Sequence, residues 1–193
     1  VLRLLLELEP VLRQQDILRN VDSVEAIVDQ FLLFARGASG EPPSDCDLAA
    51  FLAEVVAPYE SCAVSLVLAA PQSLRGDAIF PIRPSSLRRA ICNLIENALE
   101  YGAPPVTVSL RFASGGYVIA VADAGSGIPE SQRAAALRPF TRLDTSRLSQ
   151  GHCGLGLAIA QRIAEVHGGS LTLGQGPSGG LDAVLHLPAN FAG

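Results

Sequence analysis

The chain has 193 residues, of which 49% are hydrophobic and 17% are charged, and its formal net charge is −5. This size and apolar content suit one ordinary hydrophobic core with a smaller appendage. All 14 basic residues are arginines, and acidic residues outnumber them, which argues against a nucleic-acid-binding protein.

The cysteines and the hydropathy pattern argue against two further classes. The four cysteines include no C-x-x-C pair and are accompanied by only three histidines, which disfavours a structural zinc site. Unpaired cysteines of this kind suit a reduced, cytoplasmic setting. No apolar run approaches the roughly 18 to 20 residues of a membrane span, and no signal peptide begins the chain. We therefore expect a cytoplasmic chain without direct membrane contact.

The first 36 residues predict a helical hairpin. Residues 1–9 are predicted to form one apolar-striped helix, and the predicted second helix carries a heptad seam. The seam consists of Ile17, Val21, Val24, Val28, Phe31 and Ala35. A four-helix bundle of two chains would bury this seam better than one hairpin, so we expect a homodimer. The alternative is that both helices pack on the downstream domain. Residues 37–45 are rich in Gly, Pro and Ser and predict a linker.

Residues 46–193 mix helical and strand patterns and predict a second domain. Helices are expected at residues 47–61, 84–102 and 155–168. Strands are expected at residues 63–69, 77–83, 105–113, 116–123, 170–175 and 181–188, the last four as two hairpins. A loop-rich stretch covers residues 124–154. Because strict βαβ alternation is absent, the pattern predicts an α+β fold, a two-layer α/β sandwich with one mixed sheet and helices on one face.

The helix at residues 84–102 carries two different stripes. Its buried stripe is predicted to be Leu87, Ile91, Leu94, Ile95 and Ala98, and its polar stripe Arg89, Asn93, Asn97 and Glu100. Such a polar stripe can simply be solvated. Two carboxamide oxygens one turn apart are also suited to a hard cation, such as Mg²⁺, that keeps waters and phosphate ligands.

Two glycine-rich segments supply further candidate binding groups. Asp123 directly follows a strand and precedes Gly125 and Gly127, so its carboxylate could accept a hydrogen bond from an exocyclic amine. Gly151, Gly154 and Gly156 precede or open a helix, where free N–H groups attract phosphate. Each segment alone is equally consistent with an ordinary turn or helix start.

In their order and spacing, four segments together resemble a known family. "NLIEN", "DAGSGIP", "RPFTRLD" and "GHCGLGLAIA" are similar to the N, G1, F and G2 boxes of sensor histidine kinases of the GHKL ATPase superfamily. The resemblance runs from about residue 46 to the end of the chain. It implies a Bergerat ATP-binding fold preceded by a partial dimerisation and phosphotransfer hairpin.

The resemblance also implies a site for ATP and Mg²⁺. Asn93 and Asn97 would bind the metal and phosphates, and Asp123 the adenine amine. The nucleotide-binding residues that it implies are Asn93, Asn97, Asp123, Gly125, Gly127, Arg142, Gly151, Gly154, Leu155 and Gly156. Phe140 would pack the lid over the phosphates. Asn93 and Arg142 are the candidate catalytic residues.

One departure from the family pattern concerns charge at the phosphates. The family often has Lys, Arg or His where this chain has Glu100, three residues after Asn97. One phosphate-binding cation is therefore missing. Positive charge would have to come from Arg142, Arg147 or Arg89, or the affinity for nucleotide will be lower.

The second departure concerns the phosphoacceptor. The family's H box, a His followed by an acidic residue and an Arg-Thr-Pro-like stretch, is absent, and His152, His167 and His186 do not match it. Since residues 1–9 resemble the helix just after that box, we expect the box to lie upstream of Val1. A pseudokinase that lacks the His is the alternative.

The function implied is that of the ATP-binding catalytic portion of a two-component sensor histidine kinase. It would transfer the γ-phosphoryl group to a His outside this chain, and onward to an Asp of a response regulator. The parent would be an inner-membrane sensor with this part in the cytoplasm. A nucleotide-responsive regulatory module without phosphotransfer is the alternative. A gyrase-like or chaperone-like ATPase is disfavoured, because those families usually place a water-activating Glu where Asn93 stands.

Overall fold

The computed structural model describes residues 41–68, 79–143 and 154–189. The predicted hairpin at residues 1–36, together with Gly151 and His152, lies outside the described residues. The helices are α2 (Leu48–Val56), α3 (Pro84–Tyr101), α4 (Glu130–Ala136) and α5 (Gly156–Val166), with a 3₁₀ turn η1 (Ala57–Cys62). The strands are β1 (Ser44–Asp47), β2 (Val64–Leu68), β3 (Ile79–Ile82), β4 (Val106–Ala113), β5 (Gly116–Ala122), β6 (Ser170–Gln175) and β7 (Leu181–Pro188).

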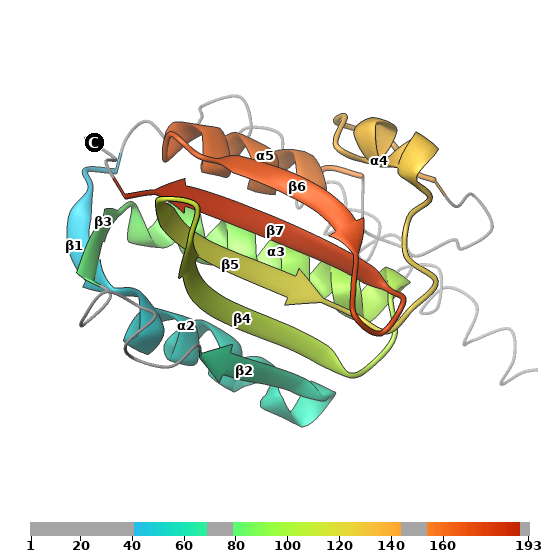
Figure 1. Cartoon of the computed structure of the whole chain (residues 1–193), viewed down its shortest axis with the longest axis horizontal. Coiled ribbons are helices and arrows are strands. Elements are labelled where there is room, and N and C mark those ends of the chain that lie inside the picture. Colours follow the sequence, from blue (N-terminus) through green and yellow to red (C-terminus); the bar gives the residue numbers. More distant parts are fainter. Residues whose placement is uncertain (1–40, 69–78, 144–153, 190–193) are drawn as a thin grey trace, which may run out of the picture.

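A mixed sheet forms one layer of the described domain (Figure 1). Its strand order is β2-β4-β5-β7-β6, with β2 parallel to β4 and the other neighbours antiparallel. The two predicted hairpins, β4-β5 and β6-β7, are confirmed. Alternating burial along β4 and β7 sends one set of side chains into the core and the other outward.

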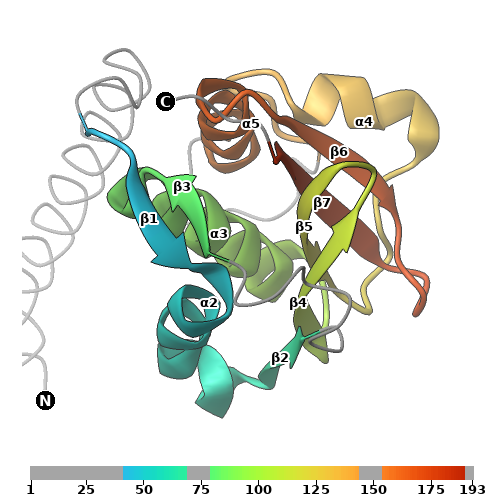
Figure 2. The ribbon, with the colours of Figure 1, turned by 60° about the vertical axis from the view of Figure 1, so that its left-hand side comes forward.

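The helices α2, α3 and α5 form the second layer, on a single face of the sheet (Figure 2). All five residues of the predicted buried stripe of α3 are buried, as is Ala90. These residues of α3 pack with α5 and with the inner face of β4 and β5. The predicted two-layer α+β fold is confirmed, and α3 is its central helix.

Strand β3 does not join the main sheet. It pairs antiparallel with β1 in a separate two-stranded sheet, with Pro81 opposite Asp45. A proline cannot donate a hydrogen bond, which confines it to edges and short pairings, and this accounts for the small sheet. Strand β1 begins at Ser44, inside the segment predicted as linker, so the folded part starts before residue 46.

Two helices differ from the expected pattern. Helix α2 ends at Val56 and passes into η1, because Pro58 lacks an N–H group and clashes with the preceding turn of an α-helix. Helix α4 lies within the stretch predicted to be loop-rich. It is seven residues long and buries only Ala136, so it leaves no hydrophobic stripe in the sequence.

Glu41 ties the segment before β1 to the start of α3. Its carboxylate accepts hydrogen bonds from the main-chain N–H groups of Ser85 (2.9 Å) and Ser86 (3.1 Å) and from the Ser86 hydroxyl (3.2 Å). Arg83 donates from Nη1 to the Glu41 main-chain oxygen. Burial opposes ionisation of Glu41, but these N–H and hydroxyl donors lower the pKa of its carboxyl below the ordinary value. Glu41 therefore caps α3 from outside the helix.

His167 joins the far ends of α3 and α5. The ring is fully buried, its Nδ1 lies 2.8 Å from the Ile163 oxygen, and its Nε2 accepts the Arg83 main-chain N–H at 3.0 Å. Burial lowers the pKa of His167, and both hydrogen bonds are consistent with a neutral ring that donates from Nδ1. The two helices that frame the candidate site are thus fixed to each other at the opposite end.

Candidate nucleotide-binding site

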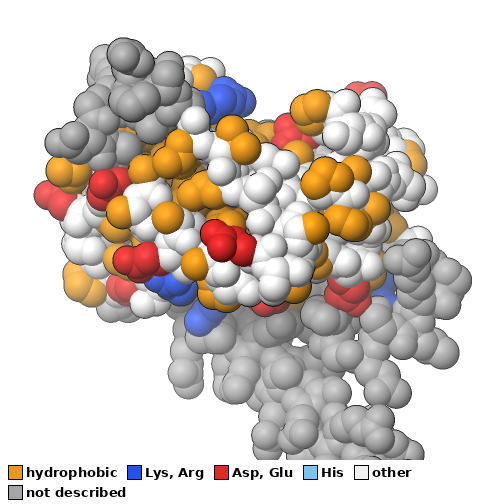
Figure 3. Space-filling view, turned by 90° about the horizontal axis from the view of Figure 1, so that it is seen from below, with side chains coloured by type: hydrophobic (Ala, Val, Ile, Leu, Met, Phe, Trp, Pro, Cys, Tyr) orange, Lys and Arg blue, Asp and Glu red, His pale blue; other side chains and the backbone are white. Residues whose placement is uncertain are grey.

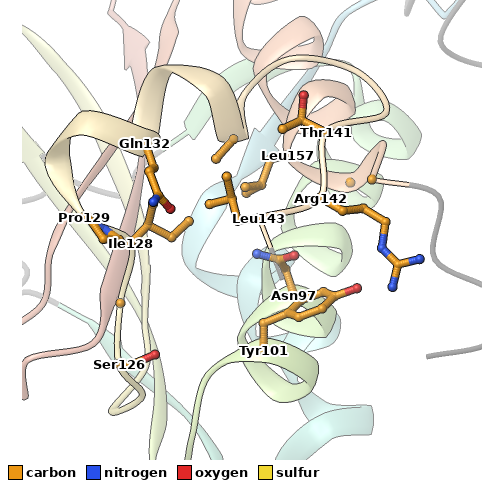
Figure 4. Close-up of a pocket in the computed structure, with 14 residues that line it drawn as sticks. Asn97, Tyr101, Ser126, Ile128, Pro129, Gln132, Thr141, Arg142, Leu143 and Leu157 are labelled. Atoms are coloured by element: carbon orange, nitrogen blue, oxygen red, sulfur yellow. The ribbon is translucent and has the colours of Figure 1, made fainter. Parts of the chain in front are cut away.

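A cavity of about 260 Å³ opens between the C-terminal half of α3, α4 and the start of α5 (Figure 4). Its walls come from segments far apart in the sequence. They are Asn97, Tyr101, Ser126, Gly127, Ile128, Pro129, Gln132, Ala136, Thr141, Arg142, Leu143, Gly154, Gly156 and Leu157. Walls that combine apolar side chains with placed polar groups are typical of small-molecule sites. Five predicted site residues line this cavity: Asn97, Gly127, Arg142, Gly154 and Gly156.

The polar stripe of α3 lies along one wall. The Asn97 carboxamide projects into the cavity (Figure 4). One turn earlier, Asn93 is half-buried and donates from Nδ2 to the Arg89 oxygen at 2.9 Å. Its Oδ1 faces the start of α5, because a Cβ at Gly156 would lie 3.3 Å from it. An acceptor oxygen of Asn93 is therefore turned toward the gap between the two helices.

These carboxamides fit a metal that is mostly held by its substrate. Among the described residues, no cluster of three or more His, Cys, Asp or Glu could hold an ion by itself. Two neutral amide oxygens would give Mg²⁺ a partial shell, and phosphates and waters would complete it. The donor set therefore fits Mg²⁺ bound together with phosphate.

Asp123 is the most constrained polar group near the cavity. Its side chain is only 4% exposed, and Oδ1 accepts the N–H groups of Gly125 (2.7 Å) and Leu181 (3.3 Å). Its own N–H donates to the Leu181 oxygen at 3.0 Å. Among the described residues, no hydrogen bond reaches Oδ2, so this oxygen can accept one from a ligand. Asp123 and Gly125 do not line the cavity itself. Both lie against Gly102, the residue that follows Tyr101 in the chain.

The glycines after Asp123 are packed against other backbone segments. A Cβ on Gly125 would lie 2.7 Å from the Gly102 Cα. Gly127 has φ +67°, and a Cβ there would lie 3.2 Å from the Gly180 carbonyl. Close approach of main chains explains both glycines, and Gly127 also lines the cavity.

The start of α5 forms another wall of the cavity. Within the part of the chain that the structure describes, no side chain caps this helix, so its first N–H groups can face an anion. Gly154 has φ +70° and lies against Thr141, and its oxygen accepts the Phe140 N–H at 3.0 Å. Arg142 is exposed at the rim.

Two predicted residues have surroundings that differ from the cavity walls. Leu155, the N-cap residue of α5, is 1% exposed and belongs to the hydrophobic core, so only its main chain could contact a ligand. Phe140, predicted to pack a lid, is 57% exposed, with φ +62°.

The sequence interpretation missed several wall residues. Tyr101 follows Asn97 by one helical turn, and this spacing could have revealed it. Its ring provides a flat, largely apolar surface in the cavity wall, and the residue that follows it, Gly102, lies against Asp123. Gln132 belongs to α4, the helix that the sequence pattern did not reveal, so no signal pointed to it.

Comparison with protein families defines the class of this chain. A family described as histidine kinase-, DNA gyrase B-, and HSP90-like ATPase matches residues 82–190, more than half of the 193 residues. The chain therefore belongs to this ATPase family. The matched segment contains α3, Asp123 and the cavity.

Individual relatives narrow the class to sensor histidine kinases. Sensor histidine kinase GtrS of Pseudomonas aeruginosa is 34% identical over 189 residues, which cover 97% of this chain and 38% of GtrS. The crystal structure of the ATP-binding domain of PrrB from Mycobacterium tuberculosis matches with TM-score 0.59 and 27% identity, over 77% of this chain and 98% of that one. The chain is a GHKL catalytic domain of the histidine kinase type.

A third similarity concerns the fold alone. The structure of full-length ShkA in complex with AMPPNP matches with TM-score 0.74 and 24% identity, over 89% of this chain and 37% of ShkA. This chain thus spans less than two fifths of either long relative. Within the described ranges, no helix is both long enough and apolar enough to cross a membrane.

Proposed function

We propose that this chain is the nucleotide-binding catalytic part of a two-component sensor histidine kinase. In this proposal it binds ATP with Mg²⁺ and presents the γ-phosphoryl group to a phosphoacceptor histidine. The phosphoryl group then passes to an aspartate of a response regulator. The family membership and the similarity to GtrS support this assignment.

The observation that carries the proposal is that the fold brings the buried Asp123 to the end of the helix that carries Asn93 and Asn97. The buried carboxylate has one oxygen left for an amine, Asn97 lines the cavity, and the Asn93 Oδ1 faces the start of α5. Neither asparagine can take a proton from water. Transfer to a positioned imidazole is therefore favoured over hydrolysis.

In this mechanism the described residues bind and orient the nucleotide. Asp123 accepts from the adenine amine, and Tyr101 lies against the base. Asn93 and Asn97 would hold Mg²⁺, which when bound neutralises phosphate oxygens. The N–H groups at the start of α5 and the Arg142 guanidinium add positive potential near the phosphates. An acceptor imidazole would then attack the γ-phosphorus in line, forming an N–P bond as the bond to the bridging oxygen breaks and ADP leaves.

Incubation of the chain with γ-labelled ATP and Mg²⁺ tests the proposal. We expect nucleotide binding, slow hydrolysis and no acid-labile label on the chain itself. Addition of a separate helical hairpin domain that carries an acceptor histidine should give acid-labile label on that domain. Stable acid-labile label on this chain alone would contradict the assignment of the acceptor to another segment.

A nucleotide-responsive regulatory module is the second candidate. Glu100 favours it, because this carboxylate lies on the same stripe of α3 as Asn93 and Asn97 and repels phosphate. In that case ATP binds, but no label reaches an acceptor hairpin that a known histidine kinase domain labels under the same conditions. The trans-labelling experiment therefore separates the two candidates.

We further propose the domain organisation and partners implied by the sequence. Residues 1–36 form a dimerising hairpin, and residues 46–193 form the catalytic domain together with the preceding segment from Glu41, which packs on it. A response regulator receiver domain is the partner, and the location is cytoplasmic. Sedimentation of the full chain against a chain beginning at Glu41, which keeps the cap of α3, tests the dimer. We expect a dimer of moderate affinity only for the full chain, and a monomer in both would refute it.

The face of the described part seen in Figure 3 offers no support for a nucleic-acid partner. Figure 3 shows mostly hydrophobic and uncharged side chains among the described residues of that face, with scattered acidic groups and no continuous basic area. The net charge of −5 agrees with this view.

A further inference from the structure

Three backbone segments enclose Asp123, and all three are glycines at the point of contact. Gly102 ends α3, Gly125 follows Asp123 by two residues, and Gly180 immediately precedes β7. A Cβ on Gly102 would lie 2.5 Å from the Asp123 Cγ. A Cβ on Gly180 would lie 2.7 Å from the Asp123 main-chain carbon and still closer to its main-chain oxygen and Oδ1. A side chain at position 102 or 180 would therefore force Asp123 or the glycine's own backbone to shift.

A side chain at position 180 would collide with Oδ1, the oxygen through which the Asp123 carboxylate is fixed. Oδ1 already accepts N–H groups from Gly125 and from Leu181, the residue after Gly180. The Asp123 main chain is fixed to the same residue by its N–H bond to the Leu181 oxygen. Asp123 therefore cannot move away from Gly180 without losing at least one of these bonds.

The turn that carries Gly180 is itself fixed. Gly176 donates to the Gly180 oxygen at 2.8 Å, and Gly179 donates to the Gly176 oxygen at 3.0 Å. Gly127 also packs on the Gly180 carbonyl. The turn between β6 and β7 is thus fixed by its own hydrogen bonds and by its contact with the loop after Asp123. It therefore cannot easily move away from Asp123.

We propose that Gly180, together with Gly102, is a positioning residue that sets the direction of the Asp123 carboxylate and so determines selectivity for a base with an exocyclic amine. This inference rests on the proposed function. Gly180 contacts no ligand in this assignment. It acts through Asp123, because the absence of a side chain lets the hairpin support Oδ1 while Oδ2 is left for the amine.

A methyl group at position 180 should weaken mainly the binding of nucleotides whose base carries the exocyclic amine. Hydrogen bonds weaken steeply with misalignment, so a displaced carboxylate loses its bond to the amine. Purine riboside triphosphate lacks the amine and makes no such bond. Gly180→Ala should therefore weaken ATP binding much more than binding of this analogue, which a general loosening of the domain would not do.

Calorimetry with both nucleotides on the full chain tests this. The parent should prefer ATP over the analogue by roughly tenfold or more, as expected for a hydrogen bond to a charged group. Gly180→Ala should reduce this ratio to about one to three, through loss of ATP affinity. The matched control is Gly174→Ala in β6, where a Cβ would meet only the Asp182 oxygen, at an ordinary 3.8 Å. The control should keep the parent ratio.

A double-mutant cycle separates positioning from general damage. In an Asp123→Ala background, Gly180→Ala should change ATP affinity by less than about threefold, because the contact that it acts on is already gone. Equal losses of ATP affinity in both backgrounds would overturn the proposal, as would an unchanged ratio in Gly180→Ala. Loss of the cooperative melting transition in Gly180→Ala would assign the glycine to folding and also overturn it. A parent that binds neither nucleotide would instead refute the proposed function.

Discussion

The two ends of the proposed nucleotide site are built in different ways. At the base end, Asp123 is buried, anchored by two N–H groups and enclosed by glycine backbones. At the phosphate end, Asn97 is half-buried on α3 and Arg142 is exposed at the rim. Binding of the base therefore depends on groups that folding has already fixed. Binding of the phosphates depends on ions and on side chains that solvent still reaches, so salt and metal should affect the two ends differently.

The largest expected effect is at the base end. Asp123→Asn places an amide where the ligand amine needs an acceptor, and a hydrogen bond to a charged group is worth about 1.5 to 3 kcal/mol. We expect ATP affinity to fall about tenfold or more, with or without Mg²⁺, when measured by calorimetry. Parent-like affinity in this variant would mean that the base binds elsewhere.

Asn97→Ala should affect only the metal-dependent part of binding. It removes an amide oxygen that lines the cavity, so we expect a loss of about fivefold to tenfold in Mg²⁺. With a chelator present, the variant and the parent should bind ATP alike. An equal loss in both conditions would show that Asn97 contacts the nucleotide directly and would remove the contrast between the two ends.

Arg142→Ala should have a smaller effect that depends on salt. The guanidinium is exposed, and exposed charge pairs are worth roughly 0 to 1 kcal/mol, so we expect a loss of about twofold to fivefold at low salt. The loss should vanish near 0.5 M salt because of screening. Arg138→Ala, an exposed arginine that does not line the cavity, is the control. A salt-independent loss would place Arg142 in a desolvated contact.

The smallest effect on binding is expected from His167, which lies at neither end. Its pKa is lowered mainly by burial, so stability from the neutral ring is complete above the ordinary pKa of 6.5 and is lost as the pH falls below it. The free energy of unfolding should fall by at most about 1.4 kcal/mol per pH unit in this range. Urea unfolding at pH 7.5, 6.0 and 5.0 measures it, and His167→Gln should show a smaller slope. A slope equal to that of the parent would assign the pH dependence to other groups.

The hydrophobic pattern of the sequence was sufficient to predict the helices and strands that have strong periodicity. Helix α3 and its buried stripe, both hairpins and α5 follow from hydrophobic spacing, because each has one face toward the core. Helix α4 and the β1-β3 pairing could not be predicted, because the first buries a single residue and the second depends on a partner more than thirty residues away. The end of α2 follows from Pro58, whose effect the sequence interpretation did not include.

The amino-acid order alone reveals which chemical groups are available: two asparagines one turn apart on a helix, a carboxylate after a strand, and glycines before a helix. Their local order is enough to indicate the family and the fold. That Gly102 and Gly180 enclose Asp123 became visible only in the folded chain. These residues are far apart in sequence and meet only when α3 and the β6-β7 turn pack against the end of β5. A glycine gives no signal of what approaches it, because the missing side chain matters only once a second backbone occupies the space.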